Sequence, residues 1–196
     1  MKPSANPSVV RVLPLLLLAA AAIFLTAVAL GVTCADIDKF YWIDHRIATG
    51  GQPKPGEIAS LKREGFRTII NLREPSEYDA DAEAAEARGL GLRYISIPVP
   101  NLEPKDEQVD TFLATLKDKK VWPAFAHCRS GNRVAAFWMI HRVLVDGWEI
   151  EPAEHEARLV GLKNENLREF AIEYICRHRK AEPRSVLCAN RIGGTD

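Results

Sequence analysis

The chain has 196 residues, of which 47% are hydrophobic and 27% charged, the composition of one globular domain of ordinary size. Its 26 basic and 26 acidic side chains balance, which argues against the basic surface of a nucleic-acid-binding protein.

The N-terminal part of the chain differs from the rest. Residues 12–32 form an uncharged run of 21 residues, preceded by Lys2 and Arg11. As a helix this run is long enough to cross the roughly 30 Å hydrocarbon core of a membrane. We therefore expect residues 1–35 to be a membrane anchor or a cleaved secretory signal, with the remainder exported. We expect residues 36–180 to form one folded domain and residues 181–196 a C-terminal tail.

Beyond residue 36, short apolar runs alternate with helical patterns. The predicted strands occupy residues 40–43, 68–72, 92–97 and 121–126. The predicted helices occupy residues 57–64, 76–89, 109–116 and 133–145, and two more begin at Pro152 and near Leu167. We expect residues 48–56 to form turns. This order predicts an α/β domain whose central, mostly parallel sheet is flanked by helices, preceded by one N-terminal apolar helix.

The segment "HCRSGNR", residues 127–133, joins a predicted buried strand to a helix. The free N–H groups of a helix N-terminus and its preceding loop bind anions, and Arg133 adds a planar guanidinium. The same field favours the thiolate form of Cys128, a nucleophile aimed at the bound anion. The alternative is that Cys128 is only a small buried hydrophobic residue.

The other two cysteines of the exported part are Cys176 and Cys188. In an oxidising compartment they could pair, since Cys128 is needed as a free thiol. The alternative is two unpaired thiols.

The cysteine loop resembles the signature of cysteine-based phosphatases, in which His-Cys begins the phosphate loop and an Arg closes it. The flanking segments "TGGQPKPGEIASLKREGFRTIINLREPSEY" and "LRYISIPV" resemble bacterial dual-specificity phosphatases, as does "VDGWEIEPAEHEARLVGL". The chain is similar to the phosphatase-like domain associated with β-lactamase-hydrolase-like proteins and to exported tyrosine phosphatases. The resemblance implies a phosphotyrosine-phosphatase-like fold and hydrolysis of phosphate monoesters.

The loop departs from the common phosphatase pattern at two positions. Four residues, not five, separate Cys128 from Arg133, and Val134 stands where a hydroxyl residue usually follows the Arg. The shorter spacing also resembles rhodanese-type sulfurtransferases, which carry a persulfide on their cysteine. A sulfurtransferase and a catalytically dead anion-binding module are therefore the alternative functions.

The resemblance assigns roles to the loop residues. Cys128 is the nucleophile and Arg133 binds the phosphate oxygens. The substrate-binding residues are His127, Arg129, Ser130, Gly131 and Asn132. Arg73 is expected to support the structure through a neighbouring carboxylate.

The general acid is harder to assign, because Asn101 stands where this class usually has Asp. Asp106 and Glu103 are the nearby carboxylates and are our candidates. The histidines have no ligand spacing, so we expect no metal and no cofactor. We expect the partner to be a phosphorylated protein or small molecule, and the membrane as well if residues 12–32 are retained.

Overall fold

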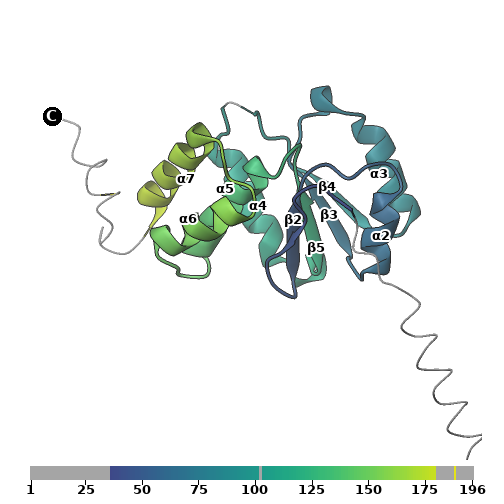
Figure 1. The fold of residues 1–196 in the computed structure, drawn as a ribbon, viewed down its shortest axis with the longest axis horizontal. Coiled ribbons are helices and arrows are strands. Elements are labelled where there is room, and N and C mark those ends of the chain that lie inside the picture. Colours follow the sequence, from purple (N-terminus) through teal and green to yellow (C-terminus); the bar gives the residue numbers. More distant parts are fainter. Residues whose placement is uncertain (1–35, 102, 180–187, 189–196) are drawn as a thin grey trace, which may run out of the picture. The chain divides into compact units, whose positions relative to one another are not determined.

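Four parallel strands form the centre of the molecule. The computed structural model describes residues 36–101, 103–179 and 188 (Figure 1). Its five-stranded sheet has the order β1-β2-β5-β3-β4, in which only β1 is antiparallel. The strands are β1 (Tyr41–Trp42), β2 (Ile47–Gly50), β3 (Thr68–Asn71), β4 (Arg93–Ser96) and β5 (Ala124–His127). The predicted α/β class and mostly parallel sheet are confirmed.

Strand β2 was not predicted, because residues 48–51 contain the small residues Ala-Thr-Gly-Gly that favour turns. In the structure all four residues of β2 are buried, and β2 pairs with the central strand β5 over its full length. A Cβ added to Gly50 would lie 3.0 Å from the ring of Phe125. Close packing on the neighbouring strand therefore explains why a glycine occupies the end of β2.

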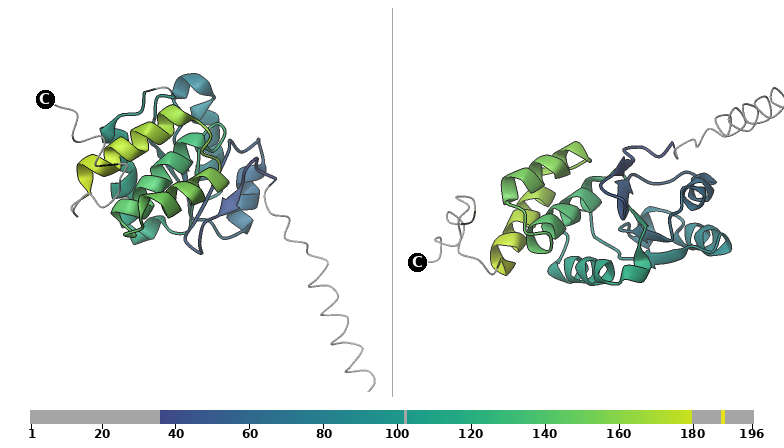
Figure 2. Two further views of the ribbon diagram at one scale, coloured as in Figure 1. Left: turned by 60° about the vertical axis from the view of Figure 1, so that its left-hand side comes forward. Right: turned by 90° about the horizontal axis from the view of Figure 1, so that it is seen from below.

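The helices form one layer on each face of the sheet (Figures 1 and 2). One layer contains α2 (Glu57–Arg63) and α3 (Ala80–Gly89). The other contains α4 (Asp106–Lys117), α5 (Asn132–Leu144), α6 (Ile150–Leu159) and α7 (Glu165–His178). Alternate residues of the strands supply the two cores: Ile69 and Phe125 pack in one, Ile70 and Ala126 in the other.

Helix α5 lies between the sheet and helices α6 and α7 (Figure 2). Eleven of its thirteen residues are buried, which confirms the prediction of a helix that is apolar almost all round. Its buried Arg142 is neutralised by Glu156 and Asp146, at 2.7 and 2.9 Å, and it contacts the faces of Trp138 and Trp148. The contacts with Glu156 and Trp148 join α5 to α6 and to the segment before it.

The helix predicted at residues 76–89 is divided into two elements. Residues Pro75–Glu77 form the 3₁₀ helix η1, and α3 begins only at Ala80. Asp79 is the N-cap of α3, because its carboxylate accepts a hydrogen bond from the Ala82 N–H at 3.0 Å. The expected start at Ser76 was therefore wrong, and Glu77 is the last residue of η1, ahead of α3.

The C-terminal helix carries a disulfide. Cys176 of α7 is bonded to Cys188, so of the two alternatives that the sequence left open the disulfide is the one observed, and Cys128 is a free thiol. The predicted anchor or signal at residues 1–35, its apolar helix, and all of the predicted tail except Cys188 lie outside the described residues. Among the residues that the structure describes, no helix is both long and apolar enough to span a membrane.

Candidate active site

The cysteine loop leaves the C-terminal end of the central strand β5 and enters α5. Cys128, which is only 1% exposed, follows His127 directly, and Gly131 is the N-cap of α5. Gly131 has φ 84°, a left-handed backbone conformation that residues other than glycine adopt only at a cost in free energy. This turn places Asn132 and Arg133 in the first turn of the helix that follows the cysteine loop.

The loop is held from the β2 side by main-chain contacts. The Gln52 N–H donates to the Arg129 carbonyl at 3.3 Å, and Lys39 Nζ donates to the Ser130 carbonyl at 3.0 Å. The carbonyl and N–H of one peptide unit point in opposite directions. The N–H groups of Ser130 and Gly131, which share peptide units with these two carbonyls, therefore point away from Gln52 and Lys39.

The connection between α6 and α7 holds the loop from the other side. The Asn132 side-chain oxygen accepts hydrogen bonds from the Lys163 and Asn164 N–H groups, at 2.7 and 3.0 Å. A Cβ added to Gly161 would lie 3.5 Å from the backbone of Gly131. The side chain of Asn132 therefore fixes the loop, which leaves its backbone N–H as the group for the predicted contact with substrate.

Arg133 is buried beside the thiol. Its Nη1 and Nη2 donate to the two oxygens of Glu77, at 2.6 and 2.7 Å, and Nη1 also donates to the Val99 carbonyl at 2.7 Å. Burial lowers the pKa of Arg133, but the Glu77 carboxylate and the Cys128 sulfur raise it, and the net shift is upward. The structure thus brings together the predicted nucleophile and the predicted phosphate-binding Arg.

Glu77, on η1, was not predicted as a site residue. Burial acts to raise its pKa, but hydrogen bonds from Arg133 and the Glu74 N–H, with the charges of Arg133 and Arg73, lower it to about 2. Glu77 is therefore an anion at neutral pH and fixes the guanidinium of Arg133 by a two-point contact. No local pattern indicated this role, because Glu77 is 56 residues from Arg133 in the sequence.

Arg73 contacts Glu77. The sequence predicted that Arg73 supports the structure through a neighbouring carboxylate, and Glu77 is that carboxylate. Its Nη2 donates to the Glu77 backbone carbonyl, and its Nε lies 3.6 Å from the Glu77 carboxylate. Its Nη1 donates to the Gln52 side-chain oxygen at 2.8 Å, and the guanidinium lies over the Tyr78 ring. Arg73 is 7% exposed, so these contacts are made away from bulk water.

His127 is fully buried and its ring points to the α2–α3 side of the sheet, where it stacks on Phe125. Its Nε2 lies 3.1 Å from the carboxylate of Glu83 on α3. Because an ionised carboxylate only accepts hydrogen bonds, Nε2 carries the proton. His127, the residue before the nucleophile, is thus bound to α3, and its predicted contact with substrate stays a prediction.

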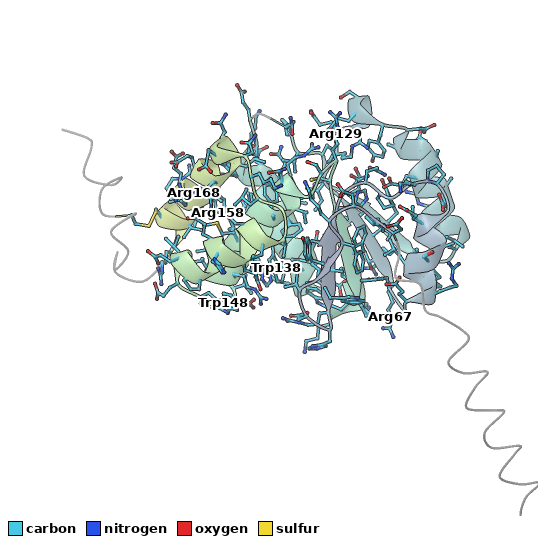
Figure 3. All side chains as sticks on the ribbon, viewed as in Figure 1. Arg67, Arg129, Trp138, Trp148, Arg158 and Arg168 are labelled. Atoms are coloured by element: carbon cyan, nitrogen blue, oxygen red, sulfur yellow. A yellow bond between two sulfur atoms is a disulfide. The ribbon has the colours of Figure 1, made fainter. Side chains whose placement is uncertain are left out.

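Arg129 is exposed at the C-terminal edge of the sheet, whereas Arg67 lies at the opposite edge (Figure 3). The Ser130 hydroxyl, 3.2 Å from the Asn132 side-chain nitrogen, is half-buried. The predicted contacts of Arg129 and Ser130 with substrate stay predictions.

The two candidate general acids lie on the segment before α4 and at its start. Asp106 is the first residue of α4 and forms an ion pair with Arg177 of α7 at 2.8 Å. Glu103 and Asn101 are exposed. The roles proposed for Asp106 and Glu103 therefore stay predictions. Within the described ranges, no cluster of three or more His, Cys, Asp or Glu side chains is placed to hold a metal ion.

A parallel sheet with a cysteine loop at the end of its central strand, and a buried Arg beside the thiol, defines the class of cysteine-based phosphatases. Comparison with known proteins agrees. The family model described as "DSP-PTPase phosphatase fused to NAD+ Kinase" matches residues 35–170, so the chain belongs to this family. The resemblance found in the sequence is confirmed, and the comparisons give no support to a sulfurtransferase.

Two curated relatives show how much of other proteins the chain covers. It is 34% identical over 113 residues to the "Beta-lactamase hydrolase-like protein" of Xylella fastidiosa strain Temecula1, covering 56% of this chain and 26% of that protein. It is 25% identical over 125 residues to the dual specificity protein phosphatase TpbA of Pseudomonas aeruginosa, covering 63% and 55%. The chain thus spans about a quarter of the first relative's length and about half of the second's.

Solved structures show the same fold. A DUF442 protein from Shewanella putrefaciens has a TM-score of 0.63 and 22% identity, covering 73% of this chain and 95% of that one. The core catalytic domain of the phosphatase SIW14 from S. cerevisiae has a TM-score of 0.62 and 17% identity, covering 70% and 86%. At these identities the likeness concerns the fold alone.

Proposed function

We propose that this chain hydrolyses phosphate monoesters through a thiophosphate intermediate on Cys128. One observation carries the proposal: the free thiol of Cys128 lies beside the buried guanidinium of Arg133, on a loop that ends at a helix N-terminus. A fixed positive charge and loop N–H groups can stabilise the equatorial oxygens of a phosphoryl group.

The reaction proceeds in two displacements. The thiolate of Cys128 attacks phosphorus, an S–P bond forms, and the P–O bond to the alcohol or phenol breaks with its electron pair. The leaving oxygen takes up one proton. Water then attacks the same phosphorus and gives one proton to the carboxylate that protonated the leaving oxygen, the S–P bond breaks with its electron pair, and inorganic phosphate and the thiolate are released. Arg133 contacts the phosphoryl oxygens in both steps.

The proton for the leaving oxygen comes from Asp106 or Glu103 in this proposal. Asn101 cannot supply it, because an amide is not a useful proton donor. Protonation matters most for poor leaving groups, since a good leaving group departs as an anion. We therefore expect aryl phosphates to react much faster than alkyl phosphates, with the difference increased in a variant that lacks the true acid.

Phosphotyrosine is the substrate class that the relatives favour. One solved structure of TpbA, similar to this chain with a TM-score of 0.57 and 22% identity, contains pTyr, whereas SIW14 is a PP-IP phosphatase. We propose phosphotyrosine in proteins as the substrate, with dual specificity toward phosphoserine. Inositol phosphates are the competing substrate class, and faster phosphate release from an inositol phosphate than from a phosphotyrosine peptide would favour them.

We also propose that residues 1–35 export the domain, as a signal or as an anchor that keeps it at the membrane. The uncharged run of residues 12–32 supports this, and so does the disulfide between Cys176 and Cys188, since disulfides persist in oxidising compartments. A reporter enzyme active only outside the cytoplasm, fused after residue 196, tests the proposal. An inactive reporter on a stable fusion would contradict it.

The function is tested by following phosphate release from a phosphotyrosine peptide and sulfur transfer from thiosulfate to cyanide side by side. We expect the wild type to release phosphate and the Cys128→Ser variant to lose at least about 10³-fold in kcat. Sulfur transfer with a persulfide on Cys128 would favour the sulfurtransferase. Phosphate binding without turnover would favour the dead anion-binding module.

A further inference from the structure

The buried carboxylate of Glu83 joins four segments beneath the catalytic edge of the sheet. One oxygen, Oε1, accepts from Asn71 at the end of β3 at 2.7 Å and from the Tyr94 hydroxyl of β4 at 2.9 Å. The same oxygen accepts from His127 at the end of β5 at 3.1 Å. The other oxygen, Oε2, accepts from the side-chain amide of Gln52, two residues beyond β2.

Glu83 is ionised although it is buried. Burial acts to raise its pKa, but the hydrogen bond and charge of His127, with hydrogen bonds from Gln52 and Tyr94, lower the pKa to about 2. At neutral pH both oxygens are therefore acceptors only. Every group that faces Glu83 must present a donor.

Gln52 is the next link, and its amide can be oriented in only one way. Its Nε2 faces the Glu83 carboxylate, and its Oε1 accepts from Arg73 Nη1 at 2.8 Å. A guanidinium only donates hydrogen bonds, and a carboxylate only accepts them. The amide, which has one donor end and one acceptor end, fits between them, and reversing it would break both bonds.

Arg73 carries the chain of contacts to the phosphate-binding residue. It donates to the backbone carbonyl of Glu77 and lies 3.6 Å from the Glu77 carboxylate. That carboxylate holds both terminal nitrogens of Arg133. The contacts therefore run from Glu83 through Gln52, Arg73 and Glu77 to Arg133. Each contact pairs a donor group with an acceptor group.

We propose that Glu83 and Gln52 are positioning residues that orient Arg133 for binding of the phosphoryl oxygens, acting through Arg73 and Glu77. The catalytic importance of Glu83 and Gln52 rests on the proposed function. The contacts themselves concern oxyanion binding, which can be measured without turnover.

An exchange of the two side chains provides the test. In Glu83→Gln, the new amide keeps its three acceptor contacts but presents a donor to the donor end of Gln52. In Gln52→Glu, two carboxylates meet. In the double variant Glu83→Gln/Gln52→Glu, the amide at 83 donates to the carboxylate at 52, which still accepts from Arg73, and the net charge is that of the wild type.

The measurement is tungstate binding to the full chain, followed as protection of Cys128 from alkylation by iodoacetamide and quantified on its peptide by mass spectrometry. We expect each single variant to bind tungstate on the order of tenfold more weakly, and the double variant to recover to within about threefold of the wild type. Gln52→Met removes both bonds without adding charge and should also weaken binding about tenfold. Glu86→Gln, one turn further along α3, is the matched control and should bind as the wild type.

A merely structural role gives a different result. If the single variants lost thermal stability while binding tungstate as the wild type does, or if the double variant bound no better than the weaker single variant, the proposal would be overturned. A wild type that binds tungstate but releases no phosphate would refute the proposed function and leave the positioning role standing. A wild type that does not bind tungstate would overturn both.

Discussion

Replacing Glu77 by Gln removes the anion that neutralises the buried Arg133. The pKa of Glu77 falls from its ordinary value of 4.5 to about 2 in the folded protein. Since a tenfold change in an equilibrium corresponds to about 1.4 kcal/mol, the ionised carboxylate stabilises the fold by about 3 kcal/mol. Gln keeps neutral hydrogen bonds to Arg133 worth about 1 kcal/mol. We therefore expect Glu77→Gln to lower the free energy of unfolding by about 2 kcal/mol at pH 7.

The stabilisation of the fold by Glu77 depends on pH. Because the pKa is lower in the folded state, the stabilisation is complete above about pH 5 and is lost as the pH falls through the folded pKa of about 2. At pH 3 about 2 kcal/mol of it is lost from the wild type. The wild type and the Gln variant should therefore unfold at nearly the same urea concentration at pH 3.

Urea unfolding at pH 7 and pH 3, followed by tryptophan fluorescence, measures both quantities. Glu107→Gln, an exposed carboxylate on α4, is the control and should change the free energy of unfolding by less than about 0.5 kcal/mol at pH 7. If Glu77→Gln cost the same at both pH values, or nothing at pH 7, the ion pair with Arg133 would not be the source of the stabilisation.

Three further changes test the loop and the fold. Arg133→Lys should lower kcat/KM for an aryl phosphate by about 10²-fold, because an ammonium cannot make the two-point contact, and an unchanged value would contradict the role of the guanidinium. Gly131→Ala should cost about 1–2 kcal/mol in urea unfolding, because φ 84° is strained for alanine; no loss would argue against this turn. Replacing Cys176 and Cys188 together by Ser should lower the stability of the full chain by about 3 kcal/mol, since the bond closes a loop of 12 residues, and equal stability would refute this.

The cysteine loop, the strand before it and the helix after it could be predicted from the sequence, because each depends on residues that are close together in the chain. The buried run before Cys128, Gly131 at the turn and the apolar pattern of α5 are all within 20 residues of each other. Periodicity and turn chemistry are sufficient for such features. Strand β2 was missed because Gly50, which is typical of a turn, is explained by its packing on Phe125, a contact that local patterns do not contain.

The partners of the loop could not be predicted, because they depend on which segments the sheet brings together. Glu77, Glu83 and Gln52 lie 44 to 81 residues from the loop residues His127, Cys128 and Arg133 in the sequence, and the C-terminal ends of parallel strands bring them to one edge. One signal was available. Glu83 lies on the buried face of α3 with Ala84 and Ala87, where a charged side chain requires a partner.

The central claim is that Cys128 accepts the phosphoryl group from substrate. The most direct measurement is mass spectrometry of the Cys128 peptide after the full chain has been mixed with an aryl phosphate and quenched in acid within milliseconds. We expect one added phosphoryl group on Cys128 that disappears as turnover is completed. A phosphoryl group on any other residue, or phosphate release by Cys128→Ser at the wild-type rate, would contradict it.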